Sequence, residues 1–135
     1  MVIYRLANYD DYENINSFYN RINKSNRTLK QFLWEFHDCP FGKAIYVVAE
    51  DKEEIVGTNC VIPINLITSD NQIIRSGKSE DTLVDPEYRG QKIFYKIYAF
   101  LFEKCKEANI QVIWGFTSAK KPFKNLDFKI PYDHQ

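Results

Sequence analysis

Hydrophobic residues in the first third of the chain recur with the spacing of one strand and two helices. An apolar run at residues 2–7 predicts a strand. After Asn8, a suitable helix N-cap, apolar residues return every three or four positions, which is typical of an amphipathic helix. Thr28, followed three residues later by Gln31, forms a capping-box pattern and predicts a second helix, which ends at Pro40.

The middle of the chain is extended, and the pattern then returns to a helical period. Residues 44–49, 55–66 and 72–84 are separated by short polar turns, so we expect an antiparallel meander of three strands. A long amphipathic helix is predicted from Gln91 onward, followed by a nearly uncharged strand at 112–116. Because a strand, a helix and a strand in this order form a crossover, the last strand should run parallel to residues 72–84.

The order of these elements predicts a single domain of the α/β (α+β) class over residues 1–135. A basic segment at residues 120–126 and an apolar segment at 128–132 add a short helix and a final strand. We therefore expect a mixed, mostly antiparallel sheet with helices on its faces. A length of 135 residues suits one domain.

Composition narrows the class of protein. A hydrophobic content of 44%, with 16% aromatic residues, excludes a disordered chain. Eighteen Lys and Arg balance 18 Asp and Glu, so the net charge gives no general attraction to nucleic acid or membrane, and neither is expected as a partner. The three cysteines have no metal-binding spacing, so we expect reduced thiols, no metal site and a cytoplasmic location. No apolar stretch reaches the ~18 residues of a membrane span.

One loop carries most of the chemical information. At residues 83–94 a predicted strand ends, a turn follows and a helix begins, and such a helix N-terminus offers unpaired N–H groups to a phosphate. Gly90 lets a ligand approach the backbone closely. Residues 89–129 contain nine basic and three acidic side chains, so the region is positive on a neutral protein. A capped structural helix with a solvated basic face would give the same pattern.

This loop resembles the acyl-CoA-binding motif of the GNAT superfamily of N-acetyltransferases, Gln/Arg-x-x-Gly-x-Gly/Ala. Residues 89–94 fit the motif in register, and residues 86–90 match the Pro-x-Tyr-Arg-Gly that usually precedes it. The resemblance extends over nearly the whole chain, because the predicted element order is also that of the GNAT fold. It implies an acetyl-CoA-dependent N-acetyltransferase, in which a primary amine attacks the thioester directly.

The resemblance also implies where acetyl-CoA, or another acyl-CoA, would bind as co-substrate. The family separates its fourth and fifth strands, here residues 72–84 and 111–117, to admit the pantetheine arm. Leu83 and Val84 would pair with that arm like an added strand. The pyrophosphate would lie against the backbone amides of six residues: Arg89, Gly90, Gln91, Lys92, Ile93 and Phe94.

Three residues depart from the family pattern. Lys92 stands where the motif has its first Gly, and its backbone is unstrained if this position is helical. Phe94 replaces a small residue and is expected to pack in the core. Phe123 stands where many relatives carry the Tyr that protonates the leaving thiolate, so we expect transfer to be modest in rate.

Glu80 and Asp81 are the candidate catalytic bases, because they lie on the central strand near the expected entry of the amine. Adjacent strand residues face opposite sides, so only one of the two should point into the cleft, and the sequence does not choose between them. Alternatively, each is a solvated carboxylate or an ion-pair partner of Arg75 or Lys78.

Two other interpretations of the function stay open. The chain can be a catalytically weak acyl-CoA-binding or regulatory module, or the N-terminal part of a longer transferase. GNAT domains close with a sixth and a seventh strand, and here the sequence stops after the sixth, which suggests a C-terminal truncation. The open sheet edge would favour a homodimer. The acceptor, a small-molecule or peptide amine, is not defined by the sequence.

Overall fold

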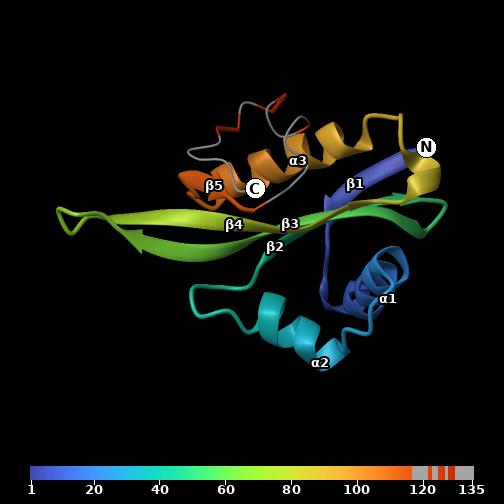
Figure 1. Ribbon diagram of the computed structural model, residues 1–135, viewed down its shortest axis with the longest axis horizontal. Coiled ribbons are helices and arrows are strands. Elements are labelled where there is room, and N and C mark those ends of the chain that lie inside the picture. Colours follow the sequence, from blue (N-terminus) through green and yellow to red (C-terminus); the bar gives the residue numbers. More distant parts are fainter. Residues whose placement is uncertain (117–121, 123–124, 127, 130–135) are drawn as a thin grey trace.

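The strands form one mixed five-stranded sheet in the order β1-β2-β3-β4-β5 (Figure 1). The computed structural model describes residues 1–116, 122, 125–126 and 128–129. The strands are β1 (Val2–Leu6), β2 (Ile45–Asp51), β3 (Glu54–Ile67), β4 (Ile73–Val84) and β5 (Val112–Trp114). The first four pair antiparallel, and β5 runs parallel to β4, as the crossover predicts. The predicted α/β class and mixed, mostly antiparallel sheet are confirmed.

Helices cover both faces of the sheet (Figure 1). α1 (Tyr12–Asn23) and α2 (Leu29–Phe32) lie on one face, and α2 continues as a π-helical turn, η2 (Leu33–His37). α3 (Ile93–Glu107) lies on the opposite face. The long helix was predicted from Gln91 and begins two residues later.

Both predicted helix caps are present. The Asn8 side chain accepts the Asp10 N–H at 3.0 Å, and the Asp11 carboxylate accepts the Asn8 N–H at 2.8 Å. This box opens a 3₁₀ turn, η1 (Tyr9–Asp11), ahead of α1. The Thr28 hydroxyl accepts the Gln31 N–H at 3.1 Å, and the Gln31 side chain accepts the Thr28 N–H at 2.8 Å. Polar side chains thus satisfy backbone donors that each helix start leaves unpaired.

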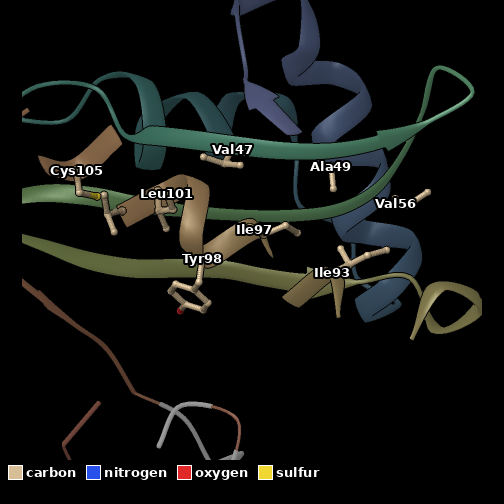
Figure 2. Close-up of a cluster of buried hydrophobic side chains, with 9 residues drawn as sticks. Val47, Ala49, Val56, Ile93, Ile97, Tyr98, Leu101 and Cys105 are labelled. Atoms are coloured by element: carbon tan, nitrogen blue, oxygen red, sulfur yellow. The ribbon is translucent and has the colours of Figure 1, made fainter. Parts of the chain in front are cut away.

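Side chains from the two sheet faces pack into two hydrophobic clusters. Val47 and Ala49 of β2 point toward α3, whereas Tyr46 and Val48 point toward α1 and α2. The α3 cluster also contains Val56, Val61, Ile93, Ile97, Tyr98, Leu101 and Cys105 (Figure 2). Burial raises the pKa of the Cys105 thiol to about 12, so it is a packing residue.

The basic segment and the final strand that the sequence predicts lie mostly outside the described residues. Leu126 and Phe128, which are described, pack against the α3 cluster. Phe123 lies outside the description. Within the described part of the chain, no helix is long and apolar enough to cross a membrane.

Close packing of β3 on β4 predicts that Gly77→Ala destabilises the fold. A methyl group at Gly77 would lie 2.9 Å from Cβ of Val61, a fully buried branched side chain. We expect the free energy of unfolding, measured by denaturant titration, to fall by about 1–3 kcal/mol. The control is Gly115→Ala, whose nearest neighbour would be 3.4 Å away and which should change stability by only ~0.5 kcal/mol. Equal effects of the two changes would contradict the prediction.

Candidate functional site

A cavity of about 670 Å³ opens where β4 and β5 separate. The two strands pair only between Ser76–Lys78 and Val112–Trp114, so residues 79–84 of β4 have no β5 partner among the described residues. Every residue that the sequence analysis placed in the site lines this cavity except Gln91. The separation of the two strands agrees with the expectation from the resemblance.

The loop after β4 is held in place by polar contacts of its first residues. Asp85 caps a 3₁₀ turn, η3 (Pro86–Tyr88), by accepting the Glu87 N–H at 2.9 Å. The Asp85 carboxylate also accepts a hydrogen bond from Arg21 of α1 at 3.1 Å. The Tyr88 hydroxyl donates to Asp51 of β2 at 2.6 Å. These contacts fix the position from which the chain enters the start of α3.

Left-handed backbone conformations shape the rest of the loop. Gly90 has φ +85°, and Lys92, the residue before α3, has φ 61° and ψ 23°. Lys92 is therefore not helical, so the condition under which its backbone would be unstrained is not met. The N–H groups of Gly90, Gln91 and Lys92 donate to no acceptor among the described residues. Such a run of free donors at a helix start is suited to an anion.

Ile93 and Phe94 face the core from the first turn of α3. Ile93 is buried in the α3 cluster. The Phe94 ring packs on Tyr98 with centroids 5.2 Å apart, which agrees with the core role expected for it. Both side chains also line the cavity, so the floor of the site at this end is apolar.

A bulge interrupts β4 beside the cavity. Thr58 pairs with Leu83 and Cys60 pairs with Glu80, so one residue of β3 faces two residues of β4, Asp81 and Thr82. Asp81 has φ 52°, outside the extended region. The alternation of side chains therefore fails at this point.

The bulge corrects the expectation that Glu80 and Asp81 face opposite sides of the sheet. Glu80 is aligned with Cys60 and Tyr46 across three strands, so it shares their face, the face of α1 and α2. Asp81 reaches the same face, because it accepts a hydrogen bond from the Tyr46 hydroxyl. Thr82 and Ser79 instead point toward α3. Both carboxylates thus lie on one side of the cavity edge.

Asp81 is held by a buried ion pair that the sequence analysis missed. Arg27 donates to its two carboxylate oxygens at 3.2 and 3.1 Å, and both side chains are less than one-tenth exposed. The guanidinium carbon lies 3.6 Å from the centroid of the Tyr19 ring. Burial, and then the charge of Asp81, raise the pKa of the Tyr46 phenol well above its usual value, so Tyr46 stays a donor. Three donors, two from Arg27 and one from Tyr46, therefore occupy the oxygens of Asp81.

Glu80 is the more accessible of the two carboxylates. It pairs with Lys78 at 2.6 Å, and both side chains are about 30% exposed, at 29% and 31%. This is one of the ion pairs that the sequence analysis considered. Arg75, the other partner considered, instead donates to the Ala108 carbonyl at 3.0 Å. Glu35 of η2 lies nearby, and its pKa is raised first by burial and then by the charges of Asp81 and Glu80.

A cluster of hydroxyl groups lies on the opposite face of β4. The Tyr98 hydroxyl of α3 is 2.7 Å from the Ser79 oxygen and 3.4 Å from that of Thr82. The Asn59 side-chain oxygen accepts from Thr82 at 2.9 Å and from Ser79 at 3.3 Å. Neither Ser79 nor Tyr98 was a sequence candidate, because a serine in a strand and a tyrosine on an apolar helix face look structural.

The left-handed conformation of Lys92 predicts that Lys92→Gly stabilises the fold. Glycine adopts this conformation without a Cβ clash, so we expect the free energy of unfolding to rise by about 0.5–1 kcal/mol. Lys96→Gly, at an exposed position near the start of the same helix, is the matched control and should lower it by about 0.5–1 kcal/mol. Thermal and denaturant unfolding of both variants measure the difference. A fall in the free energy of unfolding in Lys92→Gly would contradict the claim that the left-handed conformation of Lys92 costs stability.

The buried pair predicts a large loss of stability for Arg27→Ala. Removal of the guanidinium leaves the buried Asp81 carboxylate without its cation, so we expect a loss of about 3–5 kcal/mol, measured by denaturant unfolding. Arg21→Ala removes an arginine whose side chain is 58% exposed and pairs with Asp85, and it should cost less than about 1 kcal/mol. Similar losses of stability in the two variants would show that burial does not determine how much an ion pair contributes to the stability of this fold.

Comparison with known proteins agrees with this geometry. A family model described as an acetyltransferase (GNAT) domain matches residues 3–130. No curated protein sequence matches the chain. Among solved structures, a predicted acetyltransferase from Clostridium acetobutylicum, solved with acetyl-CoA, is 22% identical with a TM-score of 0.80. The alignment covers 100% of this chain and 94% of that one.

Two further structures share the fold. Glucosamine-6-phosphate N-acetyltransferase from Arabidopsis thaliana is 17% identical, with a TM-score of 0.76 and coverage of 100% of this chain and 96% of that one. A transcriptional regulator from Bacillus halodurans is 19% identical, with a TM-score of 0.77 and coverage of 100% and 97%. At these identities the structures show the common fold alone. Because the family model spans nearly all of the sequence, the chain belongs to the GNAT acetyltransferase family.

Proposed function

We propose that this member of the GNAT family transfers an acetyl group from acetyl-CoA to a primary amine. The observation that carries the proposal is the cavity between β4 and β5, with the donor-rich loop of residues 89–92 at one end. Along its side runs an edge of β4 that has no strand partner among the described residues. A ligand that is anionic at one end and extended in its middle fits this combination. Acetyl-CoA has both properties, and the Clostridium acetobutylicum structure was solved with it.

Binding of acetyl-CoA would use the backbone more than side chains. The N–H groups of Gly90, Gln91 and Lys92 would donate to the diphosphate, aided by the dipole of α3. Leu83 and Val84 lie on the part of β4 without a β5 partner among the described residues, so those of their backbone groups that point away from β3 are available to the amides of the pantetheine arm. This is recognition by strand addition, in which main-chain hydrogen bonds supply affinity.

We assign the general base to Glu80 in preference to Asp81. Glu80 lines the cavity and is partly exposed, whereas the oxygens of Asp81 are engaged by Arg27 and Tyr46. In the proposed reaction Glu80, directly or through water, takes the proton that the amine loses as it attacks the thioester. A β4 backbone N–H beside the cavity would donate to the oxyanion that forms.

The acceptor is proposed only as a class, a primary amine of a small molecule or a peptide. By its name, the Arabidopsis thaliana neighbour acts on glucosamine 6-phosphate. An identity of 17% is too low to assign the same substrate to this chain. A homodimer through the sheet edge beyond β5 stays a prediction, because most residues after Phe116 lie outside the description.

The test is binding followed by transfer. CoA, acetyl-CoA and longer acyl-CoAs are added in a thermal-unfolding series, where a ligand at ~100 times its Kd adds ~2.7 kcal/mol of stability. Release of free thiol from acetyl-CoA is then followed with a panel of amines. Binding without transfer to any amine would favour a catalytically weak acyl-CoA-binding module. No stabilisation by any of these ligands would overturn the proposal.

The proposed phosphate site predicts that Gln91→Glu weakens CoA binding. A new negative charge at this loop would repel the diphosphate by about 1–2 kcal/mol, so we expect the Kd to rise roughly tenfold at low salt. Isothermal titration with CoA measures the change. The control is Gln72→Glu, the same substitution in the exposed turn between β3 and β4, which should leave the Kd unchanged. An unchanged Kd in Gln91→Glu would contradict the proposal that this loop binds the diphosphate.

A further inference from the structure

Ser79 lies at the closed end of the cavity. It is the first residue of β4 after the last pair with β5, Lys78 with Trp114, and it lines the cavity. Gly115 still lies against it, since a Cβ on that glycine would be 3.4 Å from the Ser79 carbonyl oxygen. The donor-rich loop lies beyond the other end of residues 79–84, the segment without a β5 partner among the described residues. This segment spans at most ~17 Å at strand spacing, and less because of the bulge at Asp81.

The Ser79 hydroxyl can accept a hydrogen bond from Tyr98 and keep its own proton for a further acceptor. Tyr98 and Ser79 are 2.7 Å apart, and donation from the Tyr98 hydroxyl leaves the Ser79 proton to find another acceptor. The closest one is the Asn59 side-chain oxygen at 3.3 Å, which already accepts the Cys60 N–H and the Thr82 hydroxyl at 2.9 Å each. A stronger acceptor in the cavity would therefore attract this proton.

The polar cluster around Ser79 contains a buried donor without a partner. Three hydroxyl groups and the Asn59 side chain form this cluster, and the buried Asn59 nitrogen donates to no acceptor among the described residues. The Cys60 N–H fixes the orientation of that amide, because it donates to the oxygen. Tyr98 is fully buried, and in Figure 2 its ring lies apart from the aliphatic side chains of the cluster. A buried donor without a partner favours a ligand atom that accepts hydrogen bonds at this place.

We propose that the Ser79 hydroxyl, oriented by Tyr98, donates a hydrogen bond to the sulfur of CoA and stabilises the leaving thiolate. This inference rests on the proposed function, because it places a CoA molecule with its diphosphate on the loop. An extended pantetheine arm along residues 79–84 then brings the sulfur to the closed end, beside Ser79. Ser79 touches the reacting atom, and Tyr98 is a positioning residue.

The step balances without any further reactant. The amine nitrogen forms the C–N bond, the C–S bond breaks, and both electrons of that bond leave with sulfur. The amine loses its proton to Glu80 or to water, and Ser79 keeps its own proton while hydrogen-bonded to the thiolate. The thiolate is thus stabilised by Ser79 of β4, and Ser79 is held in position by Tyr98 of α3.

The test measures the thiol of bound CoA, so it needs no acceptor amine. The ultraviolet absorbance of the thiolate is titrated with pH in the complex with CoA, with desulfo-CoA as the reference. We expect bound CoA to ionise at lower pH than free CoA. In Ser79→Ala the thiolate-to-thiol ratio at a given pH should fall about tenfold, because a hydrogen bond to the charged form is lost. Tyr98→Phe should shift the titration in the same direction by less.

Matched variants separate this role from a structural one. Ser79→Thr keeps the hydroxyl and should keep the titration of the unmodified protein. Ser76→Ala, on the same strand, and Tyr12→Phe, a buried tyrosine on the other sheet face, should also leave it unchanged. If Ser79→Ala does not fold, the titration of bound CoA in Tyr98→Phe tests the proposal instead. A titration unchanged from that of the unmodified protein would overturn it.

The outcomes distinguish this inference from the proposed function. If CoA binds and its thiol titrates alike in the unmodified protein and in Ser79→Ala, the inference is overturned and the proposed function stands. If CoA does not bind to the unmodified protein, both are overturned. A titration that shifts in Ser79→Ala and returns in Ser79→Thr supports the assignment of Ser79.

Discussion

The ion pair between Arg27 and Asp81 ties the two helices on one face of the sheet to the strand that borders the cavity. Arg27 lies in the segment between α1 and α2, 54 residues from Asp81 in sequence. Its guanidinium stacks on Tyr19 and forms two hydrogen bonds with a carboxylate that the fold has removed from water. Burial of either charge alone would be strongly unfavourable, so each group depends on the other. The bulge at Asp81 is stabilised by this contact and by Tyr46.

The bulge decides which chemical groups face which side of the cavity. A regular strand would alternate, and it would place Glu80 with Thr82 and Asp81 with Leu83. With the extra residue, Glu80 and Asp81 face α1 and α2, whereas Ser79 and Thr82 face α3. Carboxylates and hydroxyl groups are thereby placed on opposite faces of one strand. In the proposed reaction, the carboxylate face suits the amine that must lose a proton, and the hydroxyl face suits the sulfur that gains charge.

Local sequence patterns were sufficient to predict the architecture, but they were not sufficient to predict how the side chains of the site are arranged. The caps at Asn8 and Thr28 and the meander depend on neighbours in sequence, so periodicity predicted them. The bulge leaves no such trace, because residues 72–84 read as an uninterrupted strand. The sequence also gives no sign that Arg27 is the partner of Asp81. Arg27 lies in a polar segment, and only the packing of α1 and α2 on the sheet brings it close to β4. Gln91, which the motif includes, does not line the cavity, although its backbone belongs to the loop.

Backbone strain at Asp81, in the bulge of β4, and at Lys92, before α3, is compensated in different ways. Among the described residues, the other non-glycine residues with positive φ are Lys24, Lys52, Glu53, Asn71 and Asn109, which lie at helix C-termini or in hairpin turns. Asp81 and Lys92 do not, and such outliers often mark functional sites. The strain at Asp81, about 1–2 kcal/mol, is offset by the hydrogen bonds of its own side chain. Lys92 makes no side-chain cap. Its backbone N–H instead has no acceptor among the described residues, and in the proposed function a bound diphosphate is the group that accepts from it.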